Sequence, residues 1–344
     1  MVTIEDVAKA AGVSRQTVSR VINRSPNVKA EVRRRVEALV ESLGYVPNLS
    51  ARRMGGGRSF LILAVNDRAR TLENWRAGRG NDWVDQMLYG GMTECERHGY
   101  HLVFELIDTG ATRAVRELGL AIGALRPDGV ILTPPHSENA ALVALLDERA
   151  IPCARIGYRG DGSHVEVYMD EKRAAQEITD RLLTLGHRRL GFIAGTPSYG
   201  VSQARIEGFR AAIAAAGLSP EAGFVRSGEF KFETAAGVVA EALASDAPPT
   251  AIIADNDEMA FAILHVADKE GVTVPDALSV VSFEDTPGVR FSVPPLSAIR
   301  QPTAAMIQKA CERLIAAATG EAAAGRYELP YQYVERASTA PGRS

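Results

Sequence analysis

The first 45 residues alternate between short amphipathic stretches and turns, which predicts three short helices. Apolar residues recur at helical spacing over residues 4–11, 15–23 and 32–43. A four-residue turn of sequence AGVS separates the first two stretches, and its Gly12 is suited to ending a helix. Two short helices joined this way are typical of a helix-turn-helix motif. We therefore expect a small all-α DNA-binding head over residues 1–46.

From residue 60 onward the pattern changes to short apolar runs that alternate with amphipathic stretches. Such alternation predicts parallel sheets with helical crossovers. The runs are FLILAV, HLVFELI, GVILT, IPCARIG, RLGFIAG, FVRSG, TAIIA, LSVVSF, SAIRQ and LPYQYVE, and the helices are expected near 84–98, 112–125, 138–150, 171–185, 201–216, 232–245, 256–271 and 303–318. This series divides into two similar sets of alternating strands and helices. We expect an α/β, periplasmic-binding-protein-like body of two parallel-sheet lobes over 60–344, with lobe one at about 60–158 and 295–320 and lobe two at about 159–294 and 321–344.

Charge is divided unevenly between these parts. Residues 1–60 contain 11 Lys and Arg against 5 Asp and Glu, a net charge of +6, whereas the remaining residues carry −9. A basic head on an acidic body predicts a polyanionic partner for the head alone.

Composition excludes several other classes of protein. No apolar stretch is long enough to cross a bilayer, and the N-terminus has no secretory signal pattern, so a cytoplasmic location is expected. The three cysteines are far apart and form no CxxC pair, so neither a metal site nor a disulfide framework is predicted. We expect no cofactor other than a small-molecule effector.

The second predicted helix places polar side chains together on the face opposite its apolar residues: Arg15, Gln16, Ser19, Arg20 and Asn23. Arginine can donate two hydrogen bonds to guanine, and glutamine can pair with adenine, in the major groove of DNA. Any one of these residues would be an ordinary surface residue. Their combination on the second helix of this motif favours base recognition.

The segment TIEDVAKAAGVSRQTVSRVIN, followed by VKAEVRRRVEALVESLGYVPN, resembles the head of the lactose-repressor (LacI/GalR) family almost residue by residue. The body carries matching landmarks in LGHRRLGFIAG, QARIEGFRAAI and AIIADNDEMAFAIL. The resemblance implies that Arg15, Gln16 and Arg20 read bases. It also implies that the DNA backbone or the turns of the motif involve Ser14, Thr17, Ser19 and Asn23.

Residues 47–59 match the hinge of that family, a segment whose paired helices enter the minor groove on cognate DNA. Asn48 is suited to capping such a helix, and Ala51 is small enough for two copies to touch. Met54 stands where members usually carry leucine as the wedge between base pairs. Methionine is a known type of wedge, so we expect a weaker version of the same contact, the alternative being that Met54 only ends a linker.

A ligand is expected in the cleft between the lobes, because α/β folds bind ligands at the ends of their strands. Arg205 offers a planar fork to sugar hydroxyls, Asn256 can donate and accept, and Phe230 can stack on a sugar ring. Members of the family often carry an aspartate lining the cleft at the position of Asp170, and Gln301 lies at the end of a strand that points to the cleft. Glu284 stands where members usually have aspartate, so the effector cannot be carried over from them.

The first loop of the body, residues 68–82, is longer than is usual in the family. With Trp75 and Trp83 in or beside it, the loop either covers the mouth of the cleft or is a plain surface loop with one packed tryptophan. The complete set of predicted effector contacts is Trp83, Asp170, Arg205, Phe230, Asn256, Glu284 and Gln301.

These observations predict a homodimeric repressor that binds a pseudo-palindromic double-stranded DNA operator under the control of a small effector, with no membrane partner. A sugar is the expected effector and a purine the main alternative. Two other classes compete: a solute-binding protein, which leaves residues 1–59 unexplained, and an enzyme acting in the cleft. No GxSxG, HExxH or phosphate-cradling glycine loop is present, so we expect no enzyme.

Arg20→Ala tests the assignment of the second helix. Loss of a bidentate contact to a base should abolish specific operator binding, while the affinity for effector stays unchanged. Electrophoretic mobility shift on the operator, with effector titration as the control, measures both. Retained operator specificity would contradict the assignment.

Overall fold

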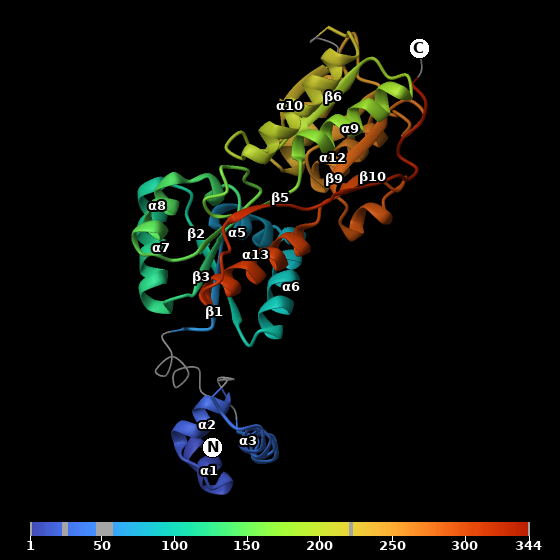
Figure 1. Cartoon of the computed structure of the whole chain (residues 1–344). Coiled ribbons are helices and arrows are strands. Elements are labelled where there is room, and N and C mark those ends of the chain that lie inside the picture. Colours follow the sequence, from blue (N-terminus) through green and yellow to red (C-terminus); the bar gives the residue numbers. More distant parts are fainter. Residues whose placement is uncertain (1, 23–26, 46–57, 220–222, 343–344) are drawn as a thin grey trace.

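A computed structural model describes residues 2–22, 27–45, 58–219 and 223–342 of the chain (Figure 1). The head consists of α1 (Ile4–Ala11), α2 (Arg15–Ile22) and α3 (Ala30–Leu43). Their apolar faces meet in a small core that includes Val7, Val18 and Val36, all fully buried. The helix-turn-helix head is thus built from the three stretches predicted by hydrophobic spacing.

Lobe one is a six-stranded parallel sheet in the order β11-β5-β4-β3-β1-β2, with helices on both faces. The helices α6 and α13 cover one face, and α7 and α8 cover the other (Figure 1). Its elements are β1 (Leu61–Asp67), α5 (Arg68–Arg76), α6 (Asp82–Arg97), β2 (His101–Ile107), α7 (Ala111–Leu125), β3 (Gly129–Leu132), the 3-10 turn η1 (His136–Glu138), α8 (Ala140–Glu148), β4 (Cys153–Ile156), β5 (Val165–Tyr168), α13 (Thr303–Ala318) and β11 (Gly325–Glu328).

Lobe two repeats the plan in the order β12-β10-β9-β8-β6-β7, in which only β12 runs antiparallel to its neighbour. One face is covered by α9 and α10, and the other by α11 and α12. Its elements are α9 (Glu171–Thr184), β6 (Leu190–Ala194), α10 (Gly200–Ala215), β7 (Gly223–Ser227), α11 (Phe232–Leu243), β8 (Ala251–Ala254), α12 (Asp257–Lys269), β9 (Ser279–Glu284), the 3-10 turn η3 (Pro287–Arg290), β10 (Ser297–Arg300) and β12 (Gln332–Val334).

The chain passes between the lobes after β5, after β10 and after β11. The assignment of chain segments to the two lobes therefore differs from the predicted one. Residues 165–168 and 325–328 were assigned to lobe two, but β5 and β11 pair with each other in the sheet of lobe one. Residues 297–300 were assigned to lobe one, but β10 pairs with β9 in lobe two.

Two strands and one helix lacked a recognisable sequence signal. Strand β11 is GRYE, an edge strand with alternating exposure and no apolar run. Strand β5 contains Glu166, which is fully buried because its carboxylate accepts hydrogen bonds from the backbone of Gly160 and Gly162. Residues 68–76, expected as part of a loop, form α5, which begins where Asp67 accepts a hydrogen bond from the backbone N–H of Arg70.

Candidate functional site

The head presents the polar face of α2 to solvent. Arg15, Gln16 and Arg20 are exposed, whereas Val18 and Val21 on the opposite face are buried in the core. Ser14 Oγ accepts a hydrogen bond from the backbone N–H of Thr17 at 3.1 Å, so this serine fixes the start of the helix. The packing leaves the predicted base-reading side chains available to DNA.

The other predicted DNA contacts of the head differ in how far they are exposed. Thr17 and Ser19 are half-buried at the edge of the polar face, and the Thr17 hydroxyl lies 2.9 Å from that of Ser14. Arg15 pairs with Glu5 at 3.2 Å, a contact between exposed side chains that adds little stability. The predicted contacts Asn23, Asn48, Ala51 and Met54 lie outside the described residues and stay predictions.

A cavity between the two lobes gathers residues from ten separate segments. Its lining comprises Asn66, Asp67, Arg70, Thr71, Asn81, Trp83, Pro134, Gly157, Glu171, Tyr199, Val201, Arg205, Phe230, Asp255, Glu284, Gln301 and Met306. The side chains leave about 80 Å³ free. That space is well below the roughly 300 Å³ at which typical ligand pockets begin, so a ligand requires side chains to move.

A buried ion cluster forms one wall of this cavity. The guanidinium of Arg205, on α10, donates from Nε to Glu171 Oε2 at 2.7 Å and from Nη1 to Asp255 Oδ1 at 2.6 Å. All three side chains are at most 9 % exposed. Asp255 also accepts from the backbone N–H of Gly195 and from the hydroxyl of Ser202. Two carboxylates therefore neutralise one arginine and are themselves held by further donors.

The cavity brings together five of the seven predicted effector contacts: Trp83, Arg205, Phe230, Glu284 and Gln301. The other two lie elsewhere. Asp170 caps α9 by accepting from the backbone N–H of Arg173, and Asn256 caps α12 by accepting from that of Met259. Neither residue lines the cavity: Asp170 lines a hollow along α9, and Asn256 lines an adjoining hollow that also includes Arg70, Asn81, Trp83 and Glu284.

Sequence reasoning missed the residues that complete the aromatic side of the cavity. Tyr199 lies edge-on to Phe230, with ring centroids 5.5 Å apart, and donates its hydroxyl hydrogen to Asp67 at 2.9 Å. The guanidinium carbon of Arg70 lies 4.0 Å from the centre of the Phe230 ring. Asp67 ends a buried strand, which is a usable signal, but nothing local to Arg70 or Tyr199 indicates that they meet across the lobes.

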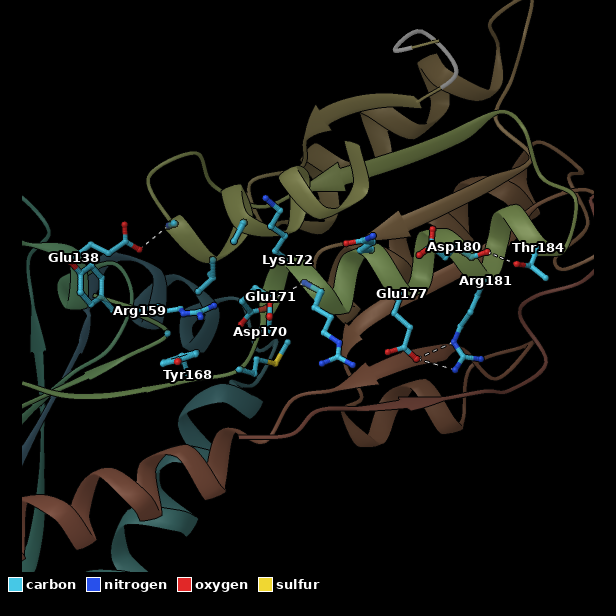
Figure 2. Close-up of a pocket in the computed structure, with 18 residues that line it drawn as sticks. Glu138, Arg159, Tyr168, Asp170, Glu171, Lys172, Glu177, Asp180, Arg181 and Thr184 are labelled. Atoms are coloured by element: carbon cyan, nitrogen blue, oxygen red, sulfur yellow. Dashed lines mark hydrogen bonds and ion pairs between the residues drawn. The ribbon is translucent and has the colours of Figure 1, made fainter. Parts of the chain in front are cut away.

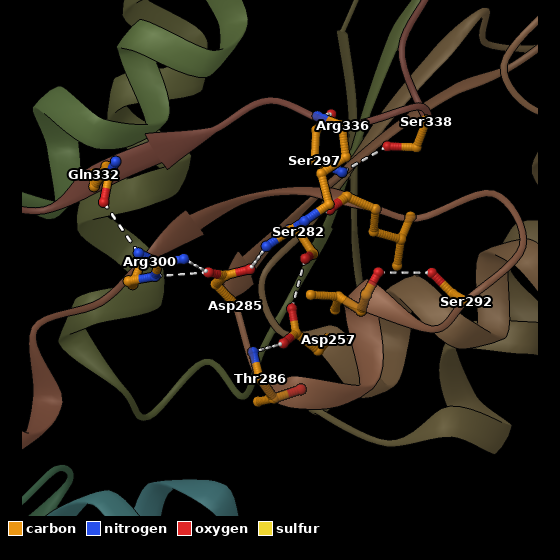
Figure 3. A network of polar contacts seen from close by, with 12 residues as sticks. Asp257, Ser282, Asp285, Thr286, Ser292, Ser297, Arg300, Gln332, Arg336 and Ser338 are labelled. Atoms are coloured by element: carbon orange, nitrogen blue, oxygen red, sulfur yellow. Dashed lines mark hydrogen bonds and ion pairs between the residues drawn. The ribbon is translucent and has the colours of Figure 1, made fainter.

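A network of carboxylates and arginines holds the turn after β9 (Figure 3). The buried carboxylate of Asp285 pairs with Arg300 at 2.7 Å and with Arg336 at 2.5 Å. The backbone at Glu284 has φ 103°, a strained conformation for a residue other than glycine. The network fixes this turn, so Glu284 faces the cavity while Asp285 does not line it.

Burial and the nearby carboxylate of Asp257 raise the pKa of Glu284 well above its ordinary value, although Arg70 and Arg205 oppose the shift. Burial likewise raises the pKa of Asp257, which accepts hydrogen bonds from Ser282 and from the backbone of Thr286. The cavity thus holds one carboxyl group that is poorly stabilised as an anion.

A wider hollow of about 1060 Å³ runs along α9 (Figure 2). Some of its charged side chains pair within the protein: Glu177 with Arg181 at 2.9 Å, and Glu138 with the backbone N–H of Gly200 at 2.9 Å. The predicted contact Asp170 lies here. Aromatic rings and buried charges instead gather in the narrower cavity between the lobes, which is the candidate ligand site.

A helix-turn-helix head joined to a two-lobed body with an interlobe cavity defines the class of DNA-binding regulators that carry a ligand-binding domain. Residues 3–48 match the lacI family of bacterial regulatory proteins, and residues 179–339 match the periplasmic binding protein-like domain. The chain is 31% identical to the HTH-type transcriptional regulator CelR of Thermobifida fusca over 327 residues, covering 93% of this chain and 92% of that protein. It is 26% identical to the lactose operon repressor of Escherichia coli, covering 98% and 91%.

Solved structures give the same result. A complex of the regulator CelR with cellobiose superposes with a TM-score of 0.73 at 28% identity, covering 98% of this chain and 100% of that one. The lac repressor dimer bound to operator and the anti-inducer ONPF superposes with a TM-score of 0.79 at 26% identity, covering 98% and 99%. The chain belongs to the lacI family and is a DNA-binding transcriptional regulator.

Within the described ranges, no helix is both long enough and apolar enough to span a membrane.

Glu284→Gln tests the electrostatics of the cavity. Because the fold raises the pKa of Glu284, the wild type loses stability as the pH rises through the interval between the ordinary and the raised value, whereas glutamine has no charge to bury. We expect the urea midpoint of the variant, relative to wild type, to increase between about pH 5 and pH 8. Glu148→Gln, at an exposed position on α8, is the control. A pH-independent difference for Glu284→Gln would contradict the assigned environment.

Proposed function

We propose that this regulator is a repressor whose operator affinity is controlled by a sugar bound in the interlobe cavity. The observation that carries the proposal is the composition of that cavity: aromatic rings at Trp83, Tyr199 and Phe230 beside the polar groups of Arg205, Glu284 and Gln301. Aromatic rings bind the apolar faces of sugars, and paired donors and acceptors bind their hydroxyls. Relatives support this choice, since CelR is solved with cellobiose and the lac repressor with ONPF.

The proposed assembly is a homodimer on a pseudo-palindromic operator, with one head per half-site. The lac repressor dimer on its operator supports this arrangement. So do exposed apolar side chains of the body, among them Tyr89 and Met92 on α6, and Phe291 and Val293 near η3, which are 58 to 91 % exposed. Neighbouring exposed apolar side chains, such as Tyr89 and Met92 three residues apart on α6, are typical of association surfaces.

In the head, we assign base reading to Arg15, Gln16 and Arg20, which α2 exposes. Phosphate contact is assigned to Ser14, Thr17 and Ser19 around the start and edge of that helix. The hinge at 47–59, with its minor-groove wedge at Met54, belongs to the same proposal.

The protein is proposed to sense its ligand without converting it. Glu171 and Asp255 are neutralised by Arg205, and Asp285 is held between Arg300 and Arg336. Glu284 then shares the cavity with carboxylates that are paired with Arg205 or, in the case of Asp67, hydrogen-bonded by the Tyr199 hydroxyl and the backbone N–H of Arg70, so no second carboxylate is free to form an acid/base pair with it. The relatives, which are transcriptional regulators, agree with this assignment.

A thermal-shift screen of disaccharides, with cellobiose first, tests the proposal. A sugar that binds only the folded state must raise the unfolding temperature. We expect at least one sugar to do so, and Gln301→Ala to weaken its binding about fivefold, the loss of one hydrogen bond. Gln203→Ala, at an exposed position on α10 outside the cavity lining, is the matched control.

Chromatography of the sugar after prolonged incubation completes the test. The proposal predicts unchanged sugar. Turnover, or a panel in which no sugar stabilises the protein, would overturn it.

A further inference from the structure

Arg70 occupies the aromatic surface on which a sugar ring would stack. Its guanidinium carbon lies 4.0 Å from the centre of the Phe230 ring and 5.6 Å from that of Tyr199. Both rings are almost fully covered, with 7 % and 9 % exposed. A guanidinium over an aromatic face is an attractive contact that strengthens when water is excluded.

The position of Phe230 depends on the backbone around it. Phe230 has φ 57°, and a Cβ at Gly195 would come within 2.0 Å of its ring. The glycine therefore leaves the space that the ring fills. The ring is fixed in the cavity wall, whereas Arg70 is a long side chain at the half-buried start of α5. Of the two partners in this contact, Arg70 is the one that can move.

Ion pairs hold the rest of the segment 68–82 against lobe two, and we call them the Arg79 clasp. Arg79 binds Glu233 through both carboxylate oxygens, at 3.0 and 2.9 Å, and lies 3.4 Å from Glu258. Lys231 lies 3.3 Å from Glu73 on α5. This segment begins directly after β1 of lobe one, so these contacts close the cleft from outside while Arg70 fills it from inside.

The small free volume of the cavity follows from this arrangement. Only about 80 Å³ stays empty among the lining residues, room for a few water molecules rather than a sugar. Charge favours Arg70 at this position, because Arg205 is already paired with Glu171 and Asp255, and Arg70 opposes the effect of burial on the pKa of the Glu284 carboxyl group.

We propose that Arg70 is a built-in competitor of the effector and thereby a specificity-determining residue of the cavity. Arg70 covers Phe230, the Arg79 clasp holds the segment over the cleft, and a sugar binds by displacing Arg70. Selection follows from the exchange, because a ligand must present an apolar ring face that replaces the guanidinium on Phe230. The competition between Arg70 and a sugar rests on the proposed function, whereas the Arg79 clasp does not, so the competition and the clasp are tested separately.

The clasp is tested without any ligand. In a Trp75→Phe background, Trp83 is the single tryptophan and lines the cavity. Arg79→Ala should increase quenching of Trp83 fluorescence by acrylamide, and raised salt should do the same to the parent protein because it screens the ion pairs. Arg76 is an exposed arginine at the end of α5, and Arg76→Ala is the control, which should leave both the quenching of Trp83 and its response to salt unchanged. Quenching that responds to neither Arg79→Ala nor salt would overturn the clasp.

The competition is tested with the sugar that stabilises the wild type in the thermal-shift screen. Arg70→Ala should tighten its binding about 2- to 30-fold by calorimetry, the range expected for one cation–π contact, and Arg76→Ala should leave it unchanged. Weaker binding by Arg70→Ala would overturn the competition and make Arg70 a direct contact of the effector. If no sugar binds either protein, the proposed function and the competition fail together, while the Trp83 measurement still decides the clasp.

Discussion

The buried ion cluster of Arg205, Glu171 and Asp255 is the interaction on which the ligand cavity depends. Removing an arginine and two carboxylates from water is costly, so these side chains persist only because each is paired and hydrogen-bonded. The cluster joins the start of α9, the middle of α10 and the residue after β8, three segments distant in the sequence. The cluster fixes the position of one wall of the cavity. It also neutralises two of the cavity's carboxylates, which are then unavailable for acid–base chemistry.

A cavity bounded by both lobes can control the head only if the ligand interacts differently with different arrangements of the lobes. The structure offers contacts that depend on that arrangement. Tyr199 of lobe two binds Asp67 of lobe one, Glu138 of lobe one binds the backbone of Gly200 in lobe two, and Arg79 reaches across to Glu233. Under the proposed function, a ligand that enters between the lobes breaks some of these contacts and preserves others, and this difference supplies the free energy of the switch.

Sequence patterns predicted the individual helices and strands whose formation depends on the spacing of residues within one segment. The three helices of the head, the exposed polar face of α2 and most alternating elements of the body follow from periodicity and capping within each segment. Pairing between distant segments was predicted less well: β5 and β11 carry no apolar run, and they join lobe one rather than lobe two. Five of the predicted contacts line the cavity, but Asp170 and Asn256 serve as helix caps. Residue types that suit a ligand equally suit a helix N-terminus, and only the fold decides which capping residue also lines the cavity, as Asp67 and Asn81 do. Arg70 was beyond sequence reasoning, because its partner Phe230 comes from the other lobe.

The proposed function requires the cavity and the DNA-binding head to be energetically coupled. Fluorescence anisotropy of a labelled operator, selected in vitro from random duplexes, measures the operator Kd at increasing concentrations of the stabilising sugar. We expect saturating sugar to change the operator Kd at least about fivefold, and operator to change the sugar Kd by the same factor, since coupling is reciprocal. An operator Kd that is identical with and without saturating sugar would contradict it.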